Sequence, residues 1–244
     1  MRSRYFFLTG AIVFIVGLVI AFPARVAYRW MVPPAVQLSG LHGSVWSGSA
    51  REATASGVYL RDLRWRAKPL ALLTGKLRYA IEASPISGFV DGTVALGFGG
   101  TLTLTGIKGS LPLQALEQAL GMSGIRGTVN VQLDRLLLAN GFPLAVEGFV
   151  EIDNLQVRAI DRASIGGYRA EFFTQESGVG ASVEDTDGVI DLAGSLQLAD
   201  DRSYQFIALL AAKPQAPSGV RRQLQFLGSP NDRGQHELRL EGKF

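Results

Sequence analysis

The sequence predicts a mainly β protein: one elongated, curved antiparallel sheet, like an open sandwich or half-barrel, with two short helices, preceded by one N-terminal transmembrane helix. Three observations predict this class. The chain of 244 residues begins with a long apolar run. After residue 34, short stretches alternate apolar and polar side chains, which is typical of half-buried strands. Glycine, at 29 residues, is spread between these stretches and is not gathered in a linker.

The first element is the apolar run at residues 5–22, which carries no charged side chain. As a helix it would be about 27 Å long, close to the ~30 Å hydrocarbon core of a bilayer. Two arginines stand on each side of it: Arg2 and Arg4 before, Arg25 and Arg29 after. A cleaved signal peptide would have a shorter apolar region and small residues at its cleavage site. We therefore interpret the run as an uncleaved transmembrane helix, in preference to a signal peptide or a buried core helix.

This interpretation divides the chain into four parts. We expect a cytoplasmic tail at residues 1–4, the transmembrane helix at 5–22, a membrane-proximal linker at 23–34, and a single exported β domain at 35–244. Four of the 24 basic residues flank the apolar run and none of the 21 acidic residues does, so the β domain is close to neutral. A nucleic-acid-binding domain would be basic. The composition fits a single-pass protein of a bacterial inner membrane with most of its chain in the periplasm.

The strands follow from apolar residues at every second position. They are expected around Val58, Leu77–Ile81, Val94–Leu96, Leu102–Leu104, Val129–Leu133, Val150–Ile152, Leu196–Leu198, Tyr204–Ala208 and Leu238–Leu240. Gly, Asn or Asp stands between them, as at residues 139–142 and 199–201, which indicates hairpins. In the last strand Gly242 takes a position on the apolar side, where a missing side chain lets a neighbour approach. The pattern offers no clear means of closing the sheet, so we expect open edge strands.

Two stretches are predicted to be helical. Residues 111–121 place leucines at helical spacing between Pro112 and Gly121, and residues 218–228 do the same with Val220, Leu224 and Leu227 before a glycine. A further helical turn is expected at residues 69–74. We interpret the two helices as lids on the sheet.

No stretch predicts a catalytic, cofactor or metal site. His42 and His236 are far apart in the sequence, and the chain has no cysteine. Glu184, Asp185 and Asp187 do not have the spacing of a calcium loop, so a solvated turn is favoured over a calcium site. The sequence therefore indicates a protein that is not an enzyme and has no cofactor.

The charges are unevenly distributed. Residues 51–78 hold seven basic side chains against two acidic ones, and residues 147–201 hold twelve acidic against three basic. Two interpretations stay open. Either these charges solvate the outer faces of strands, or they mark a basic end near lipid headgroups and an acidic end that faces a partner.

Several short motifs resemble a known family. Residues 41–48 read LHGSVWSG and are followed by LRW at residues 63–65. Later motifs are GSLQL at 194–198, AKP at 212–214, LGSP at 227–230 and LEGKF at 240–244. In this order, after an N-terminal anchor, they resemble protein N of the bacterial type II secretion system. Ser44 and Val45 stand where that pattern has Thr and Leu. The motif positions, expected to be structural, are Gly43, Trp46, Gly48, Trp65, Gly228, Pro230, Gly234 and Gly242.

The resemblance implies a non-enzymatic accessory component of the machinery that exports folded periplasmic proteins across the outer membrane. Its partners would be other secretion subunits of the inner membrane or periplasm, with no nucleic acid and no cofactor. An alternative from another class is an anchored periplasmic lipid carrier or bridge-like β protein. A continuous apolar trough on the inner face of the sheet would favour the lipid carrier, and a closed core would favour the scaffold. We expect Trp46 and Trp65 to be core residues.

Overall fold

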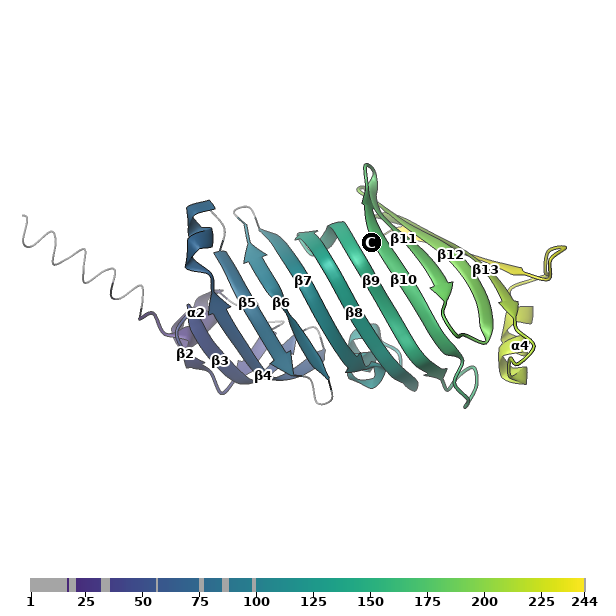
Figure 1. Cartoon of the computed structure of the whole chain (residues 1–244), viewed down its shortest axis with the longest axis horizontal. Helices are drawn as coiled ribbons and strands as arrows, with labels where there is room; N and C mark the ends of the chain where they lie inside the picture. The colour runs from purple at the N-terminus through teal and green to yellow at the C-terminus, as the bar shows by residue number, and fades with distance from the viewer. Residues whose placement is uncertain are drawn as a thin grey trace, which may run out of the picture.

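One antiparallel sheet of fourteen strands forms the body of the protein in a computed structural model (Figure 1). The structure describes residues 17, 21–31, 36–55, 57–74, 77–84, 88–97 and 100–243. Strands follow each other in sequence order across the sheet, except that β2 pairs beside β3. The strands are β1 Val36–Ser39, β2 His42–Gly43, β3 Ser47–Ala55, β4 Val58–Ala67, β5 Leu77–Ser84, β6 Phe89–Leu96, β7 Thr101–Pro112, β8 Ile125–Ala139, β9 Phe142–Val157, β10 Gly166–Gln175, β11 Gly178–Asp185, β12 Ile190–Ala199, β13 Ser203–Ala212 and β14 His236–Lys243.

The predicted transmembrane segment lies almost entirely outside the described residues. Within the part of the chain that is described, no helix has the length and apolarity needed to cross a membrane. The first described helix is α2, Ala24–Met31, in the stretch expected to be a linker.

The tight hairpin predicted at residues 139–142 is confirmed. Asn140 and Gly141 both have positive φ, 51° and 77°, and they join β8 to β9. Asparagine and glycine tolerate this left-handed conformation, and a turn of two such residues matches the twist of the flanking strands. The two longest strands of the sheet are therefore paired through a local signal.

The sheet has one apolar face. Residues that pair across neighbouring strands lie on the same side, so the register shows which side chains share a face. One such row crosses β4 to β9: Ala67, Tyr79, Val94, Leu104, Leu136 and Val146. Another crosses β8 to β14: Val131, Val150, Ala170, Val183, Gly194, Ala208 and Leu238. We call the side that carries these two rows the apolar face and the opposite side the outer face.

Four helical elements, at three places along the sheet, cover parts of the apolar face. Helix α2 lies at the N-terminal end. The 3-10 turn η2, Leu113–Leu116, and α3, Glu117–Leu120, lie at the middle of the sheet. Helix α4, Ser218–Gln225, packs at the C-terminal end. Helices are thus confirmed within the two predicted stretches, at residues 113–120, of which 113–116 are 3-10, and at residues 218–225. Residues 111–112 belong to the end of β7 instead. The turn expected at residues 69–74 is η1, Pro69–Thr74.

The core consists of two separate clusters beneath these helical segments. At the middle, Leu113 of η2 packs with Leu111, Ile125 and Val129. At the C-terminal end, residues of β13 and α4 pack with residues of two connecting segments in a cluster of six buried side chains: Ile165, Ala208, Leu210, Ala216, Val220 and Leu224. Elsewhere on the apolar face, apolar side chains stay partly exposed. Leu96 on β6 is 48% exposed, and Leu240 on β14 is 50% exposed. The apolar face is therefore neither a closed core nor a bare surface.

No second strand pairs with either edge strand among the described residues, although the Tyr28 hydroxyl bonds to the backbone of Val36 and Leu38 on β1. Strand β1 pairs with β3 alone, and β14 pairs with β13 alone. An edge strand has backbone N–H and C=O groups on one side that no neighbouring strand uses. This agrees with the expectation of open edge strands.

Candidate binding cavity and the family motif residues

An apolar cavity lies at the N-terminal end of the sheet, between α2 and the apolar face. Its volume is about 700 Å³, within the ~300–1,000 Å³ range of small-molecule sites. The lining residues are Ala24, Ala27, Tyr28, Leu38, Leu41, Val45, Trp46, Leu63, Trp65, Leu77, Tyr79, Ile81 and Leu96. None of them carries a charge at neutral pH. Burial raises the pKa of Tyr79, as expected for a phenol in poorly hydrated surroundings.

Helix α2 is held over this cavity by contacts that tie it to the β domain. Ala24 and Ala27 of the helix itself are buried. The Arg25 Nε donates a hydrogen bond to the Leu41 carbonyl oxygen at 2.9 Å. The Tyr28 hydroxyl donates to the Val36 carbonyl oxygen and accepts from the backbone N–H of Leu38, each at 3.2 Å. The helix is therefore a structural wall of the cavity as well as the start of the domain.

Four of the motif residues meet beside α2. Gly48 and Trp65 are directly paired on β3 and β4, and a Cβ on Gly48 would stand 2.4 Å from the Trp65 ring. The glycine therefore lets the indole lie flat on the backbone. The Trp65 Nε1 donates to the Ser44 carbonyl oxygen at 3.1 Å, which joins the ring to the turn between Gly43 and Trp46.

The same turn is closed by the Ser44 hydroxyl. Its oxygen accepts from the backbone N–H groups of Trp46 and Ser47, at 3.2 and 3.3 Å. Gly43 has φ +88°, and a Cβ there would stand 2.5 Å from the Ser47 carbonyl oxygen. Trp46 and Trp65 are both half-buried and line the cavity. The structure thus places them on a cavity wall, where the sequence alone suggested core positions.

The other four motif residues lie at the opposite end of the sheet. Gly228, Pro230 and Gly234 belong to the exposed connection from α4 to β14, and both glycines have positive φ. Gly242 pairs with Tyr204, whose ring would be 2.8 Å from a Cβ on the glycine. The sequence predicted that a neighbouring group would come close to Gly242, and that group is the Tyr204 ring. The fold does not bring the two groups of motif residues together, and their contacts are those of turns and of aromatic–glycine pairs.

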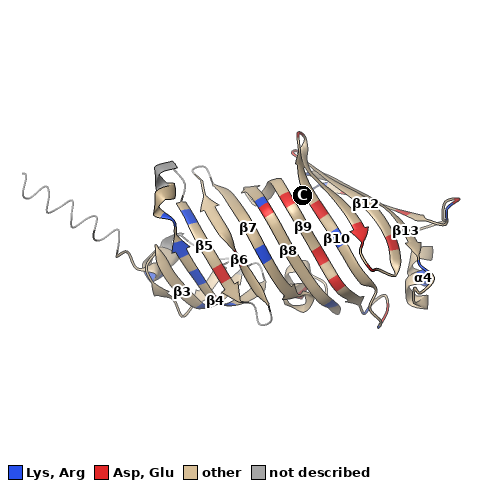
Figure 2. Cartoon of the chain, in the orientation of Figure 1, with Lys and Arg blue, Asp and Glu red and all other residues tan. Residues whose placement is uncertain are grey.

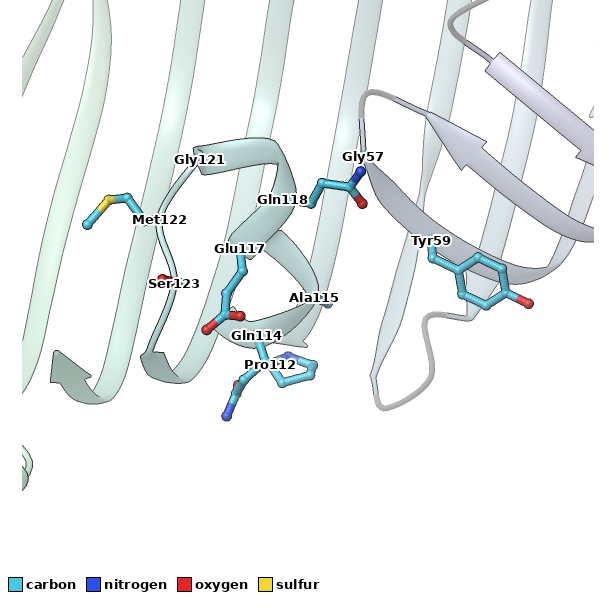
Figure 3. Close-up of a pocket in the computed structure, with 10 residues that line it drawn as sticks. All are labelled: Gly57, Tyr59, Pro112, Gln114, Ala115, Glu117, Gln118, Gly121, Met122 and Ser123. Carbon is cyan, nitrogen blue, oxygen red and sulfur yellow. The ribbon is translucent and has the colours of Figure 1, made fainter. Parts of the chain in front are cut away.

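A second cavity, of about 530 Å³, lies between the β3–β4 hairpin and α3 (Figure 3). Gly57 at the hairpin tip has φ +83°, and a Cβ there would be 3.3 Å from the Ala119 nitrogen. The hairpin therefore reaches the helix that lies on the apolar face, which shows that the sheet curls over that face. The Glu117 carboxylate accepts hydrogen bonds from the backbone N–H groups of Gly124 and Ile125, at 2.8 and 3.2 Å. We interpret this cavity as a gap between packed elements and not as a binding site, because the Glu117 carboxylate is already hydrogen-bonded to the backbone.

The residues first considered for metal binding do not form a site in the described part of the chain. No group of three or more His, Asp or Glu side chains comes together there. His42 lies on β2 and His236 on β14, near opposite ends of the sheet. Asp185 is 9% exposed, contacts the Lys213 Nζ at 2.5 Å and accepts from the Leu192 backbone N–H at 2.9 Å. The interpretation of Asp185 as part of a solvated turn is therefore wrong: Asp185 is an ion-paired residue at the end of β11.

The charged residues are unevenly distributed along the sheet (Figure 2). Arg61, Arg64 and Arg66 on β4 and Arg78 on β5 are exposed at the N-terminal end, near α2. On β9 and β10, Arg169 lies 3.8 Å from Glu151 and 3.8 Å from the centre of the Phe149 ring. The basic and acidic regions of the sequence are thus separated along the length of the sheet.

Taken together, the single open sheet, the partly covered apolar face and the uncharged cavity define a mainly β protein. Comparison with known proteins shows its family. The model of the family "Type II secretion system (T2SS), protein N" matches residues 34–239. The chain belongs to this family, which the order of its motifs had indicated.

Two curated relatives support the assignment over almost the whole chain. The chain is 26% identical to the type II secretion system protein N of Aeromonas hydrophila, over 93% of this chain and 92% of the relative. It is 23% identical to the protein of the same name from Vibrio cholerae serotype O1, over 95% of this chain and 94% of the relative. No solved structure shows a significant match.

Proposed function

We propose that this chain is a single-pass inner-membrane accessory component of the type II secretion machinery, without enzymatic activity, that supports export through contacts with other secretion subunits. The observation that carries the proposal is the family match over residues 34–239. The apolar run at residues 5–22 supports the anchor, with the N-terminus in the cytoplasm and the β domain in the periplasm.

The open edge at β14 is the surface we assign to a partner subunit. It offers eight residues, twice the length of β1. An added strand gains affinity from main-chain hydrogen bonds and specificity from side chains along the edge. Glu237, Arg239 and Glu241 alternate in charge along β14 and are exposed. Such charges discourage non-specific pairing of an open edge, while a complementary strand would satisfy them.

Cross-linking through single cysteines tests this assignment. The native chain has no cysteine, so an introduced thiol is unique within it. We expect Arg239→Cys on β14 to cross-link to another secretion subunit in native membranes when a short thiol-reactive cross-linker is added. The products are identified by mass spectrometry.

Lys108→Cys provides the matched control, because Lys108 is an exposed basic residue on the outer face of β7, far from either edge. It should give little or none of the same product. Equal yields from both positions, or a product from Lys108→Cys alone, would show that β14 is not the contact surface.

Removal of the predicted anchor tests the division of the chain. We expect residues 23–244 to form a soluble domain whose circular dichroism is mainly that of β structure, because fourteen strands make up most of the described residues. A shorter fragment, residues 32–244, lacks α2 and should be less stable by about 1–3 kcal/mol, since apolar contacts and α2 hydrogen bonds are lost. A mainly helical spectrum, or equal urea midpoints for the two fragments, would contradict this expectation.

A further inference from the structure

The apolar cavity beside α2 is suited to hydrocarbon, for a reason that lies in its hydrogen bonds. Its walls are strands whose backbone groups pair with neighbouring strands, and uncharged side chains. The polar atoms of Trp65 and Tyr28 bond to backbone groups of the protein itself. A peptide in this cavity would bury backbone N–H and C=O groups with few partners, which is unfavourable. An alkyl chain has no such groups.

A cationic site adjoins the cavity. A third cavity is lined by Arg25, Val26, Tyr28, Arg29, Leu38, Gly40 and Leu41. It shares Tyr28, Leu38 and Leu41 with the apolar cavity. Two exposed arginines therefore stand beside an opening lined by apolar side chains. Guanidinium groups bind phosphate oxygens through paired hydrogen bonds, so the combined site has a place for an anionic headgroup and a place for its acyl chain.

The position in the chain favours a membrane lipid as the source of such a ligand. Helix α2 begins at Ala24, two residues after the predicted transmembrane segment ends. The cavity would then lie at the membrane surface, with the exposed arginines of β4 and β5 also at this end of the sheet. Basic residues near an anionic leaflet are attracted to its headgroups. This step rests on the membrane anchor of the proposed function.

We propose that the cavity between α2 and strands β4–β6 binds one acyl chain of an anionic phospholipid, with Arg25 and Arg29 facing the phosphate. The continuous rows of the apolar face extend from this cavity towards β14, and parts of that face stay open between the helices. A lipid bound in the cavity would therefore have further apolar surface of the same sheet beside it.

Photolabelling of the full-length protein tests the site. The protein is placed in vesicles of phosphatidylcholine and phosphatidylglycerol with a trace of phosphatidylglycerol that carries a diazirine on one acyl chain. After illumination, adducts are mapped by mass spectrometry. We expect adducts on cavity residues of β4–β6, in addition to any on residues 5–22. The same diazirine on a free fatty acid should label this site less, because it lacks the phosphate.

A matched pair of variants gives the contrast. Leu96 lines the cavity and is 48% exposed, while Leu240 lies at the far end of the apolar face and is 50% exposed. Leu96→Glu should lower labelling of β4–β6 roughly tenfold, because a carboxylate at the wall must be desolvated when a chain binds. Leu240→Glu should leave it unchanged. Arg29→Gln should reduce the preference for the phosphatidylglycerol probe over a phosphatidylcholine probe.

Three results would overturn the proposal: adducts confined to residues 5–22, equal loss of labelling in both leucine variants, or cavity labelling that Leu96→Glu does not change. If another protein or a second copy of this chain filled the cavity, lipid adducts would be confined to residues 5–22. Flotation separates the causes. A protein that floats with the vesicles but lacks cavity adducts has an anchor and no lipid site. A protein that does not float has no anchor, which removes both this proposal and the membrane part of the proposed function.

Discussion

Val220→Asp is expected to destabilise the domain by about 4 kcal/mol or more, which is large against a typical total of about 5–15 kcal/mol. Val220 is 1% exposed and lies at the centre of the cluster that joins α4 to β13. Leu224, one helical turn later, is buried in the same cluster, so an introduced carboxylate would find no polar partner there. Urea unfolding followed by circular dichroism measures the loss.

Two controls accompany this prediction. Gln223→Asp places the same side chain on an exposed position of α4, and should cost no more than about 1 kcal/mol. Lowering the pH should return part of the stability of the Val220→Asp variant, because burial raises the pKa of a carboxyl group and protonation removes the buried charge. Similar urea midpoints for the two variants would show that α4 does not hold the C-terminal end of the sheet.

Gly148→Ala is expected to cost about 2–5 kcal/mol, from a strained backbone and a direct clash. Gly148 has φ +127°, and a Cβ there would stand 2.2 Å from the Gln132 carbonyl oxygen of β8. It pairs with Leu133 next to a register shift between the two longest strands. An added methyl group would have to push β8 away from β9 at the middle of the sheet. Thermal or urea unfolding gives the change in stability.

Gly106→Ala is the matched control, on strand β7, which lies on the other side of β8. Gly106 also has positive φ, +60°, but nothing lies within 4 Å of an added Cβ. It should therefore show only the conformational cost, about 1–2 kcal/mol. The difference between the two variants isolates the clash. If Gly106→Ala were as destabilising as Gly148→Ala, the backbone conformation and not the close approach of β8 would explain both.

Most of the fold could be predicted from local sequence patterns. The period-two stretches mark β4 to β9 and β12 to β14, because each of these strands has one face on the apolar side and one in water. Val220, Leu224 and the following glycine marked α4 for the same reason at helical spacing. The strands β10 and β11 were not singled out; alanine stands at one apolar-face position of each, Ala170 and Ala181, which weakens the alternation of apolar and polar side chains.

The candidate site was less visible. Trp65, Gly48 and Gly43 were named as motif positions, but the sequence did not show that they lie together or that a cavity forms beside them. Helix α2, Ala24–Met31, lies in the stretch expected from the sequence to be a linker. Its place depends on hydrogen bonds to Leu41 and Val36, residues that become its neighbours only in the folded chain.

The sequence by itself determined most of the strands, their antiparallel hairpin connections, the two lid helices and the family, because periodicity and turn residues act over a few positions along the chain. Only the tertiary structure decided how far the sheet curls, where the helices cover the apolar face, and that an uncharged cavity remains beside α2. These features depend on contacts between distant residues, such as Gly57 with α3 and Gly48 with Trp65. Close packing between distant segments leaves no periodic trace in either one, since what matters is the volume that each side chain leaves for the other.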